Sequence, residues 1–470
     1  MQPSGPTAAV LAPYWDFWEA SVGSQFRSDR EQLLSIAVEQ LIDKGVKVLW
    51  HGLMDSPTAA IEAATVVAAL EVDVVIIAQT MAAPPSHAMA ALERLKEPLI
   101  VWGIQNSTSI PDEFDESHIT SLGATVGTPM LTNVLQRTGR VYELLLSALG
   151  DISAVERVAG LARAGSTATR LSVSRMARIG EPIPGYACVD VADDLLRGAL
   201  GIDVVRIHPK AVKERFHRVT DGDLERRTND TNREFDVRSG PDEDLRRSLR
   251  LALALESIDD ELNIDFGAMN CHVAEIRFDG DIGVTPCFGL GHETSRGIPY
   301  TCSGDVLTAV AMFVGRSLSG AALYHEIEAV DFETGEVALA NSGEHDLGWC
   351  GAGTRPAVEP NAWFSSDLHT GVSVRFELPA GHATLIGFTE HPDEASGFRF
   401  VVAEGEISGR ALRSSPTVSG LFRFESGPVD STWERWANAG VNHHSAVSPG
   451  HLAGQIKAVA NYLQVGCITV

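Results

Sequence analysis

Apolar and polar positions in the first hundred residues alternate between short apolar runs and amphipathic stretches. The runs have strand length, and the stretches repeat their apolar residues at helical spacing. The run at 74–78 is apolar on both faces, as a central strand of a parallel sheet is. We therefore predict a parallel sheet flanked by helices, with strands at 8–12, 46–50, 74–78 and 99–102 and helices at 28–44, 58–70 and 86–95. Ligands of such sheets bind beyond the carboxyl ends of the strands, where Gln79, Thr80, Gln105 and Asn106 lie.

The pattern of apolar and polar positions changes twice along the rest of the chain. A second αβ block is predicted from strand signals at 176–180, 202–208, 263–269 and 271–276 and helices at 242–258 and 304–318. After residue 319 short alternating strands predict an antiparallel sandwich or barrel, at 323–327, 337–340, 372–378, 383–388 and 398–404, with a closing helix at 451–463. The predicted fold class is α/β, with domains at 1–165, 166–320 and 321–470.

Composition narrows the class of partner. The chain has 470 residues and a formal net charge of −25, which repels nucleic acid and anionic membrane surfaces. No apolar stretch reaches membrane-spanning length, and the first residues carry no basic group ahead of an apolar run, so we expect a cytoplasmic protein. The six cysteines are scattered, which favours buried free thiols in a reducing compartment.

Carboxylates and histidines gather in the last third of the chain. Glu326 is predicted on a strand, His345 in the turn after the next strand, and His443-His444 just before a helix. Mn²⁺, Co²⁺ and Mg²⁺ accept carboxylate ligands, and the first two also accept imidazole, so Glu326, His345 and His444 are candidate metal ligands. Each has an ordinary alternative: Glu326 with Glu328 is typical of a solvent-facing strand, and a His-His pair before a helix is typical of a surface or cap. The spacing of these residues alone therefore leaves a metal site as one hypothesis beside the ordinary alternatives.

The order of several motifs resembles the L-fucose and L-arabinose isomerase superfamily. The resemblance covers roughly residues 8 to 466, although each motif is short. It rests on the aromatic loop at 11–18, Lys96-Glu97-Pro98-Leu99 leading to Gln105-Asn106, Arg178-Ile179-Gly180 with Pro184-Gly185-Tyr186, Gly297 to Asp305, Leu323-Tyr324-His325-Glu326, and His443-His444.

The resemblance implies a metal-dependent sugar isomerase of two αβ domains and a β-rich domain. It implies a divalent cofactor, manganese with cobalt or magnesium as alternatives, a sugar substrate, and a homo-oligomer, trimer or hexamer. The metal ligands it implies are Glu326, His444 and His345, with Asn341 in place of His345 if no gap is allowed. The other site residues that we expect are Asp305 and His443 beside Glu326 in catalysis, and Tyr14, Trp15, Gln105 and Ser303 in substrate binding.

Ser303 departs from the superfamily's pattern, which has a metal-binding glutamate at this position. Isomerisation through an enediol needs a base and an electrophile, and a serine is a poor substitute for either. Asp305, or Glu293 from the neighbouring loop, can replace the lost group, Glu326 can act alone as the base, or the reaction can differ. The leading hypothesis is an aldose-ketose isomerase acting on an unphosphorylated sugar. The alternatives are a metal-assisted epimerase or lyase on a sugar derivative, and a non-catalytic sugar-binding protein.

Overall fold

The computed structural model divides the chain into two compact units. They span Ser4–Arg170 and Leu171–Val470, and each is described here by itself. The described residues are 5–238, 242–273, 275–361, 370–410 and 418–470. The second unit contains both the second parallel sheet and the antiparallel sheet, so the predicted boundary near residue 320 lies inside it; the three-domain division stays a prediction.

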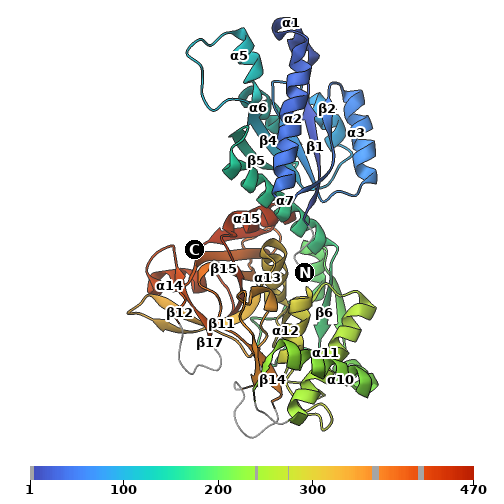
Figure 1. The fold of residues 1–470 in the computed structure, drawn as a ribbon, viewed down its shortest axis with the longest axis vertical. Coiled ribbons are helices and arrows are strands. Elements are labelled where there is room, and N and C mark those ends of the chain that lie inside the picture. The colour runs from blue at the N-terminus through green and yellow to red at the C-terminus, as the bar shows by residue number, and fades with distance from the viewer. Residues whose placement is uncertain (1–4, 239–241, 274, 362–369, 411–417) are drawn as a thin grey trace. The chain divides into compact units, whose positions relative to one another are not determined.

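A parallel sheet of strand order β2-β1-β3-β4-β5 forms the centre of the N-terminal unit (Figure 1). Its strands are β1 (Thr7–Pro13), β2 (Lys47–Met54), β3 (Val74–Gln79), β4 (Leu99–Gln105) and β5 (Glu143–Ala148). Its helices are α1 (Glu19–Val22), α2 (Gln25–Asp43), α3 (Pro57–Ala69), α4 (Ser86–Leu92), α5 (Glu116–Ser121), α6 (Ala124–Arg137) and α7 (Ile152–Ser172), with a 3-10 turn at Asp16–Trp18.

Alternation within the central strands builds the two cores of this unit. Ala8 and Val10 of β1 pack with α2 and α7, whereas Ala9 and Leu11 point to the other face and pack with α3, α4 and α6. Strands buried on both faces are apolar throughout, which is why the run at 74–78 could be assigned to a central strand. The predicted parallel αβ layer is confirmed.

The C-terminal unit begins with a second parallel sheet of order β10-β9-β6-β7. Its strands are β6 (Arg175–Ile179), β7 (Asp203–Ile207), β9 (Phe266–Met269) and β10 (Tyr300–Thr301). The helices of this region are α8 (Asp193–Leu200), α9 (Pro209–Arg218), α10 (Asp221–Glu234), α11 (Asp242–Leu262), α12 (Cys287–Arg296) and α13 (Val306–Ser319). Helix α13 is apolar and buried along nearly its whole length, and contacts both this parallel sheet and the antiparallel sheet that follows it.

The remaining strands form a β-barrel. The sheet order is β15-β18-β11-β12-β17-β16-β19, and a further pairing between β15 and β16 closes the ring. Every pairing in the ring is antiparallel; β19 joins β16 in parallel outside it. The strands are β11 (Leu323–Asp331), β12 (Glu336–Ala340), β15 (Gly381–Glu390), β16 (Phe398–Ile407), β17 (Val418–Phe424), β18 (His444–Pro449) and β19 (Gly466–Thr469). The predicted antiparallel C-terminal region is confirmed.

Smaller elements complete the C-terminal unit. A three-stranded sheet joins β14 (Val372–Arg375), β13 (Ala357–Pro360) and β8 (Asp236–Val237). Helices α14 (Val429–Asn438) and α15 (Ala453–Leu463) accompany the barrel, with a 3-10 turn at Leu347–Trp349.

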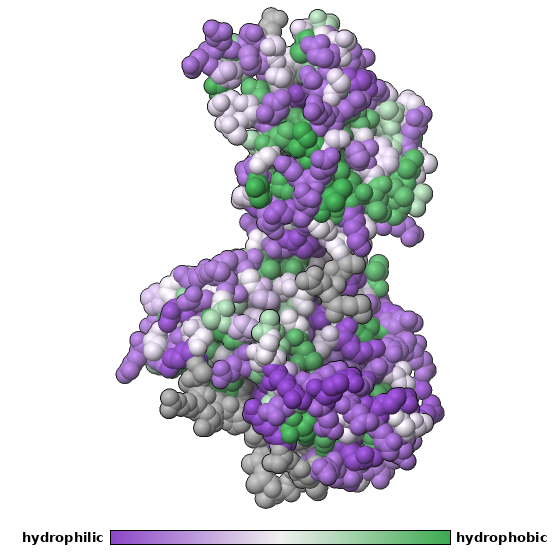
Figure 2. Space-filling view, viewed as in Figure 1, coloured by the Kyte–Doolittle hydropathy of each residue, from purple (hydrophilic) through white to green (hydrophobic). Residues whose placement is uncertain are grey.

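Some local predictions differ from the structure. The described part of 271–276 forms turns rather than a strand, and His444 begins strand β18, so the His-His pair does not lie directly before a helix. Cys271, Cys287 and Cys302 are buried as expected, but Cys188 is exposed. Among the described residues no helix is long and apolar enough to cross a membrane. Most of the surface visible in Figure 2 is hydrophilic.

Candidate functional site

The barrel register brings Glu326 and His444 together. Strand β11 pairs with β18 so that Glu326 lies directly opposite His444. Directly opposite residues in an antiparallel pair project to the same face with closely spaced Cβ atoms. The pairing between β11 and β18 therefore places a carboxylate beside an imidazole, although the two residues are far apart in the sequence.

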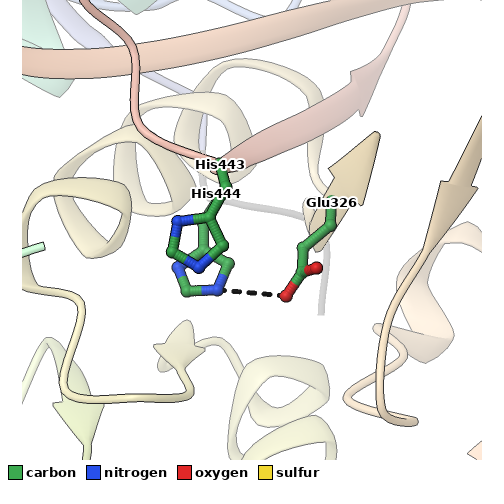
Figure 3. A group of neighbouring side chains, drawn as sticks. All are labelled: Glu326, His443 and His444. Atoms are coloured by element: carbon green, nitrogen blue, oxygen red, sulfur yellow. Dashed lines mark ion pairs between the residues drawn. The ribbon is translucent and has the colours of Figure 1, made fainter. Parts of the chain in front are cut away.

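Glu326, His443 and His444 form one cluster (Figure 3). His444 Nε2 lies 3.2 Å from Glu326 Oε1, and the two histidine rings have centroids 3.7 Å apart. One ligand atom from each of the three side chains lies within 4.8 Å of the others. His444 is buried, Glu326 is half-buried and His443 is exposed, so the cluster opens toward solvent on the His443 side.

Asp305 holds the other side of the His444 ring. It is the N-cap residue of α13, where its Oδ1 accepts a 2.8 Å hydrogen bond from the Thr308 backbone amide. Its Oδ2 lies 2.9 Å from His444 Nδ1. A carboxylate on one ring nitrogen fixes the orientation of the imidazole and directs the other nitrogen outward. Asp305 thus aims His444 Nε2 at Glu326.

The electrostatics of the cluster follow from these contacts. Burial lowers the pKa of His444, but hydrogen bonds to Asp305 and Glu326 outweigh it and raise that pKa to about 9. Burial also opposes ionisation of Glu326, but the hydrogen bond to His444 and the charges of the neighbouring histidines together outweigh it and lower the pKa of Glu326. Both partners favour the charged form of the other. At neutral pH the cluster therefore pairs an ionised Glu326 with a protonated His444, and a metal ion bound to His444 would displace that proton.

Two neighbours of the cluster were not assigned roles from the sequence. Asn442 donates from Nδ2 to Asp305 Oδ2 at 3.3 Å and accepts from the His444 backbone amide. The Tyr324 ring packs 4.7 Å from the His444 ring, and its buried hydroxyl has no partner among the described residues. Tyr324 belongs to the motif at 323–326 and Asn442 directly precedes the His443-His444 pair, and this proximity was the available signal.

His345 lies outside this cluster. It is 1% exposed, packs edge-on to Phe376, and lines a cavity of about 630 Å³ together with Arg375. Neither of its ring nitrogens has a partner among the described residues. The alternative ligand, Asn341, uses its amide within the loop: Nδ2 donates to the Tyr324 carbonyl and Oδ1 accepts from the Gly343 amide. The structure brings neither of them into the group formed by Glu326, His443 and His444.

The residues proposed to compensate for Ser303 fall in different places. Ser303 itself has a left-handed backbone, with φ of 59°, immediately before Gly304 and Asp305. Glu293 lies in helix α12 rather than in a loop, fully buried, and pairs with Arg296 at 2.6 Å. It belongs to a separate cluster with Asp259. Asp305 is the residue of this set that contacts the site, through His444.

Three expected substrate contacts lie in the N-terminal unit. Tyr14 follows β1, is buried, and donates from its hydroxyl to Glu19 at 2.7 Å. Trp15 stacks on Phe17 with ring centroids 4.5 Å apart. Gln105 ends β4 and donates to the Ser107 carbonyl at 2.9 Å. Their contribution to a sugar site stays a prediction.

The comparisons with known proteins bear on the chain as a whole. No family model matches it. The chain is 22% identical over 348 residues to "Sulfoquinovose isomerase" of Priestia aryabhattai, covering 71% of this chain and 72% of that protein. The protein of the same name from Priestia megaterium matches with the same identity and coverage. The chain is thus similar, at a distance, to proteins named as sugar isomerases, which is compatible with the resemblance seen in its motifs.

Proposed function

We propose that this protein is a divalent-metal-dependent isomerase that interconverts an aldose and a ketose, both unphosphorylated. The observation that carries the proposal is the chain of contacts from Asp305 through His444 to Glu326, with His443 alongside. The similarity to sulfoquinovose isomerases supports the same class of reaction. Sulfoquinovose is accordingly the first substrate to test.

The donor set of the site fits a divalent cation. Glu326, His443 and His444 offer one carboxylate oxygen and two imidazole nitrogens within 4.8 Å of one another, which suits Mn²⁺ or Co²⁺. Asp305 supplies the outer hydrogen bond that a metal-binding histidine commonly makes. Glu326, His443 and His444 would hold the ion. When bound, it would polarise the sugar carbonyl and stabilise negative charge on the sugar oxygen.

The side chains divide the remaining tasks. Glu326, whose pKa is lowered beside His444, is available in ionised form to remove the proton from the hydroxyl-bearing carbon next to the carbonyl and to return it to the former carbonyl carbon, while the hydroxyl proton passes to the former carbonyl oxygen. Asp305 keeps the His444 ring in register with Glu326. His443 would offer one ring nitrogen to the ion, and its other nitrogen, on the exposed side of the cluster, is placed to hydrogen-bond a sugar hydroxyl.

A pair of variants on strand β11 tests this assignment. Glu326→Gln keeps the shape of the side chain and removes the base, so turnover of sulfoquinovose or another active aldose should be abolished while the fold is kept. Glu328→Gln is the matched control, because Glu328 is an exposed glutamate two residues along the same strand. Retained activity in Glu326→Gln would sink the proposal. Product analysis of the wild type separates isomerisation from epimerisation or cleavage, because only isomerisation yields a ketose of unchanged mass from an aldose.

A further inference from the structure

A second cluster of histidines and carboxylates lies elsewhere on the barrel. His382 is the second residue of β15, Glu425 directly follows β17, and His451 lies between β18 and α15. One ligand atom from each of the three side chains lies within 4.8 Å of the others. None of these residues takes part in the proposed isomerase reaction.

Hydrogen bonds fix the backbone that carries the two histidines. The loop before α15 is tied to β15, since Gly450 donates to the His382 carbonyl at 2.7 Å and the Thr384 hydroxyl donates to the Gly450 carbonyl at 2.7 Å. The Leu452 amide then donates to the same Thr384 hydroxyl at 3.1 Å. Thr384 is fully buried. His382 and His451 therefore project from a backbone that is already ordered, which reduces the entropic cost of binding a ligand between them.

The distances within the cluster match those between ligands of one ion. Glu425 Oε1 lies 3.3 Å from His382 Nδ1 and 3.7 Å from His451 Nε2, and the two rings have centroids 4.1 Å apart. Ligands of a tetrahedral zinc ion at bond lengths near 2.0 Å are about 3.3 Å apart. The same carboxylate oxygen thus faces both imidazoles at close to the spacing that a shared ion imposes.

Glu404 lies behind one of the two rings, at ion-pair distance. Its Oε2 lies 3.7 Å from His451 Nδ1, on the side of the ring opposite the nitrogen that faces Glu425. Its Oε1 accepts a 2.9 Å hydrogen bond from the Ala453 amide in the first turn of α15. A carboxylate behind a ligating histidine is a regular feature of protein metal sites, because it fixes the ring and strengthens the ligand.

We propose that His382, Glu425 and His451 bind a divalent ion of the zinc type, with Glu404 orienting His451. Imidazole and carboxylate ligands suit Zn²⁺, and three protein ligands leave one position of a tetrahedral site for water. The net charge of −25 favours cation binding at the surface. An ion here ties β15 and β17 to the loop before α15, so it stabilises the barrel independently of the Glu326 cluster.

Zinc stoichiometry tests the site directly. The full chain is stripped with a chelator, dialysed against Zn²⁺, and its bound zinc is counted in wild type, His451→Ala and His217→Ala. His217 is the control, an exposed histidine paired with the single carboxylate Asp281 at 3.4 Å. We expect His451→Ala to bind one zinc ion fewer than wild type and His217→Ala to bind the same number. Equal stoichiometry in all three proteins would overturn the proposal.

A second pair of variants tests the orienting role of Glu404. Glu404→Gln should weaken this zinc site by roughly 10- to 100-fold, measured by competition with a chelating dye, while the number of ions at saturation is unchanged. Glu394→Gln is the control, a glutamate in the turn between β15 and β16 that is as exposed as Glu404 and pairs with Arg399 at 2.9 Å. Equal zinc affinities in the two variants would show that Glu404 does not orient His451. Zinc bound at the Glu326 cluster affects neither test. Each test compares variants with wild type, and the Glu326 cluster is the same in all of them.

Discussion

Asp305 Oδ2 lies 2.9 Å from His444 Nδ1, so the carboxylate that caps helix α13 also orients the buried histidine of the candidate active site. Asp305 is fully buried, and its Oδ2 also accepts from the Thr308 hydroxyl and from Asn442. One side chain thereby joins the start of a core helix to strand β18. The position of His444 relative to Glu326 depends on this junction.

Asp305→Asn separates the two roles of this residue. Asparagine caps helices about as well as aspartate, so the amide from Thr308 keeps an acceptor and the fold should persist. The hydrogen bond that orients His444 loses its charged acceptor, and we expect isomerase activity or metal affinity to fall roughly 10- to 100-fold. Steady-state kinetics with a metal titration measures the change, and an unaltered thermal midpoint serves as the control. Wild-type kinetics in this variant would show that Asp305 acts only as a cap.

A buried carboxyl pair should make stability depend on pH. Burial raises the pKa of Asp259 to about 7 and that of Glu293 to about 9, where the charge of Asp259 adds to the effect, while Tyr300 donates to Asp259 at 2.6 Å. A raised carboxyl pKa means that the folded protein holds a proton which the unfolded chain releases above about pH 4.3. The free energy of unfolding should therefore fall as the pH rises from about 4.3 to the raised pKa. Over this range the folding equilibrium constant should fall by up to about tenfold per pH unit.

Glu293→Gln tests that proton. The amide can donate to Asp259 without titrating, so the variant should show a flatter stability profile than wild type between pH 5 and 9 in urea unfolding, a window set by ordinary carboxyl pKa values near about 4.3 and the raised one. Its relative advantage should grow toward alkaline pH. Parallel profiles would contradict a shared proton.

The ion pair between Arg316 and Asp346 should be costly to break. Arg316 Nε lies 3.1 Å from Asp346 Oδ2, with side chains 9% and 0% exposed, and Asp346 also accepts from the amides of Ala322 and Gly348. Asp346→Ala leaves a buried guanidinium unpaired, and we expect a loss of about 3–5 kcal/mol in the free energy of unfolding. Asp194→Ala is the control, since that aspartate is 93% exposed and pairs with Arg197, which is 52% exposed, and it should change stability by less than about 0.5 kcal/mol. Equal effects would contradict the role of burial.

Ser303→Glu distinguishes a working site from a decayed one. The proposed function needs only Glu326 and the two histidines, so the wild type should already turn over its sugar. Side-by-side assays of wild type and Ser303→Glu measure this. Activity that appears only in the variant would instead support a sugar-binding protein that lost a carboxylate.

Much of the fold could be predicted because it depends on local pattern. The run at 74–78 is β3, and the apolar spacing at 304–318 is α13, which begins at Val306 after its Asp305 cap. The closure of the barrel could not be predicted, because it requires β17 to pair with β12, and the register between segments so far apart in the sequence depends on packing that no local pattern records. The strand β18 could not be predicted for the same reason. It is only six residues long and begins directly after His443.

The candidate site could also be predicted only in part, because the motifs are local and the strand pairing is not. Glu326, Asp305, His443 and His444 were singled out from motifs, and the pairing of β11 with β18 brings them together. His345 was chosen by its place in a motif, but the loop after β12 directs it to a different buried position beside Phe376. Glu293 was assigned to a loop; helix α12 instead buries it against Asp259. Neither outcome could be read from spacing.

Metal binding by the Glu326 cluster is the central claim, and a Mn²⁺ titration of thermal stability tests it most directly. Binding to the folded protein raises the midpoint by mass action. We predict a rise with Mn²⁺ in wild type and in Glu328→Gln, and its loss in Glu326→Gln and in His444→Ala. An equal rise in all four proteins, or none in wild type, would contradict the account.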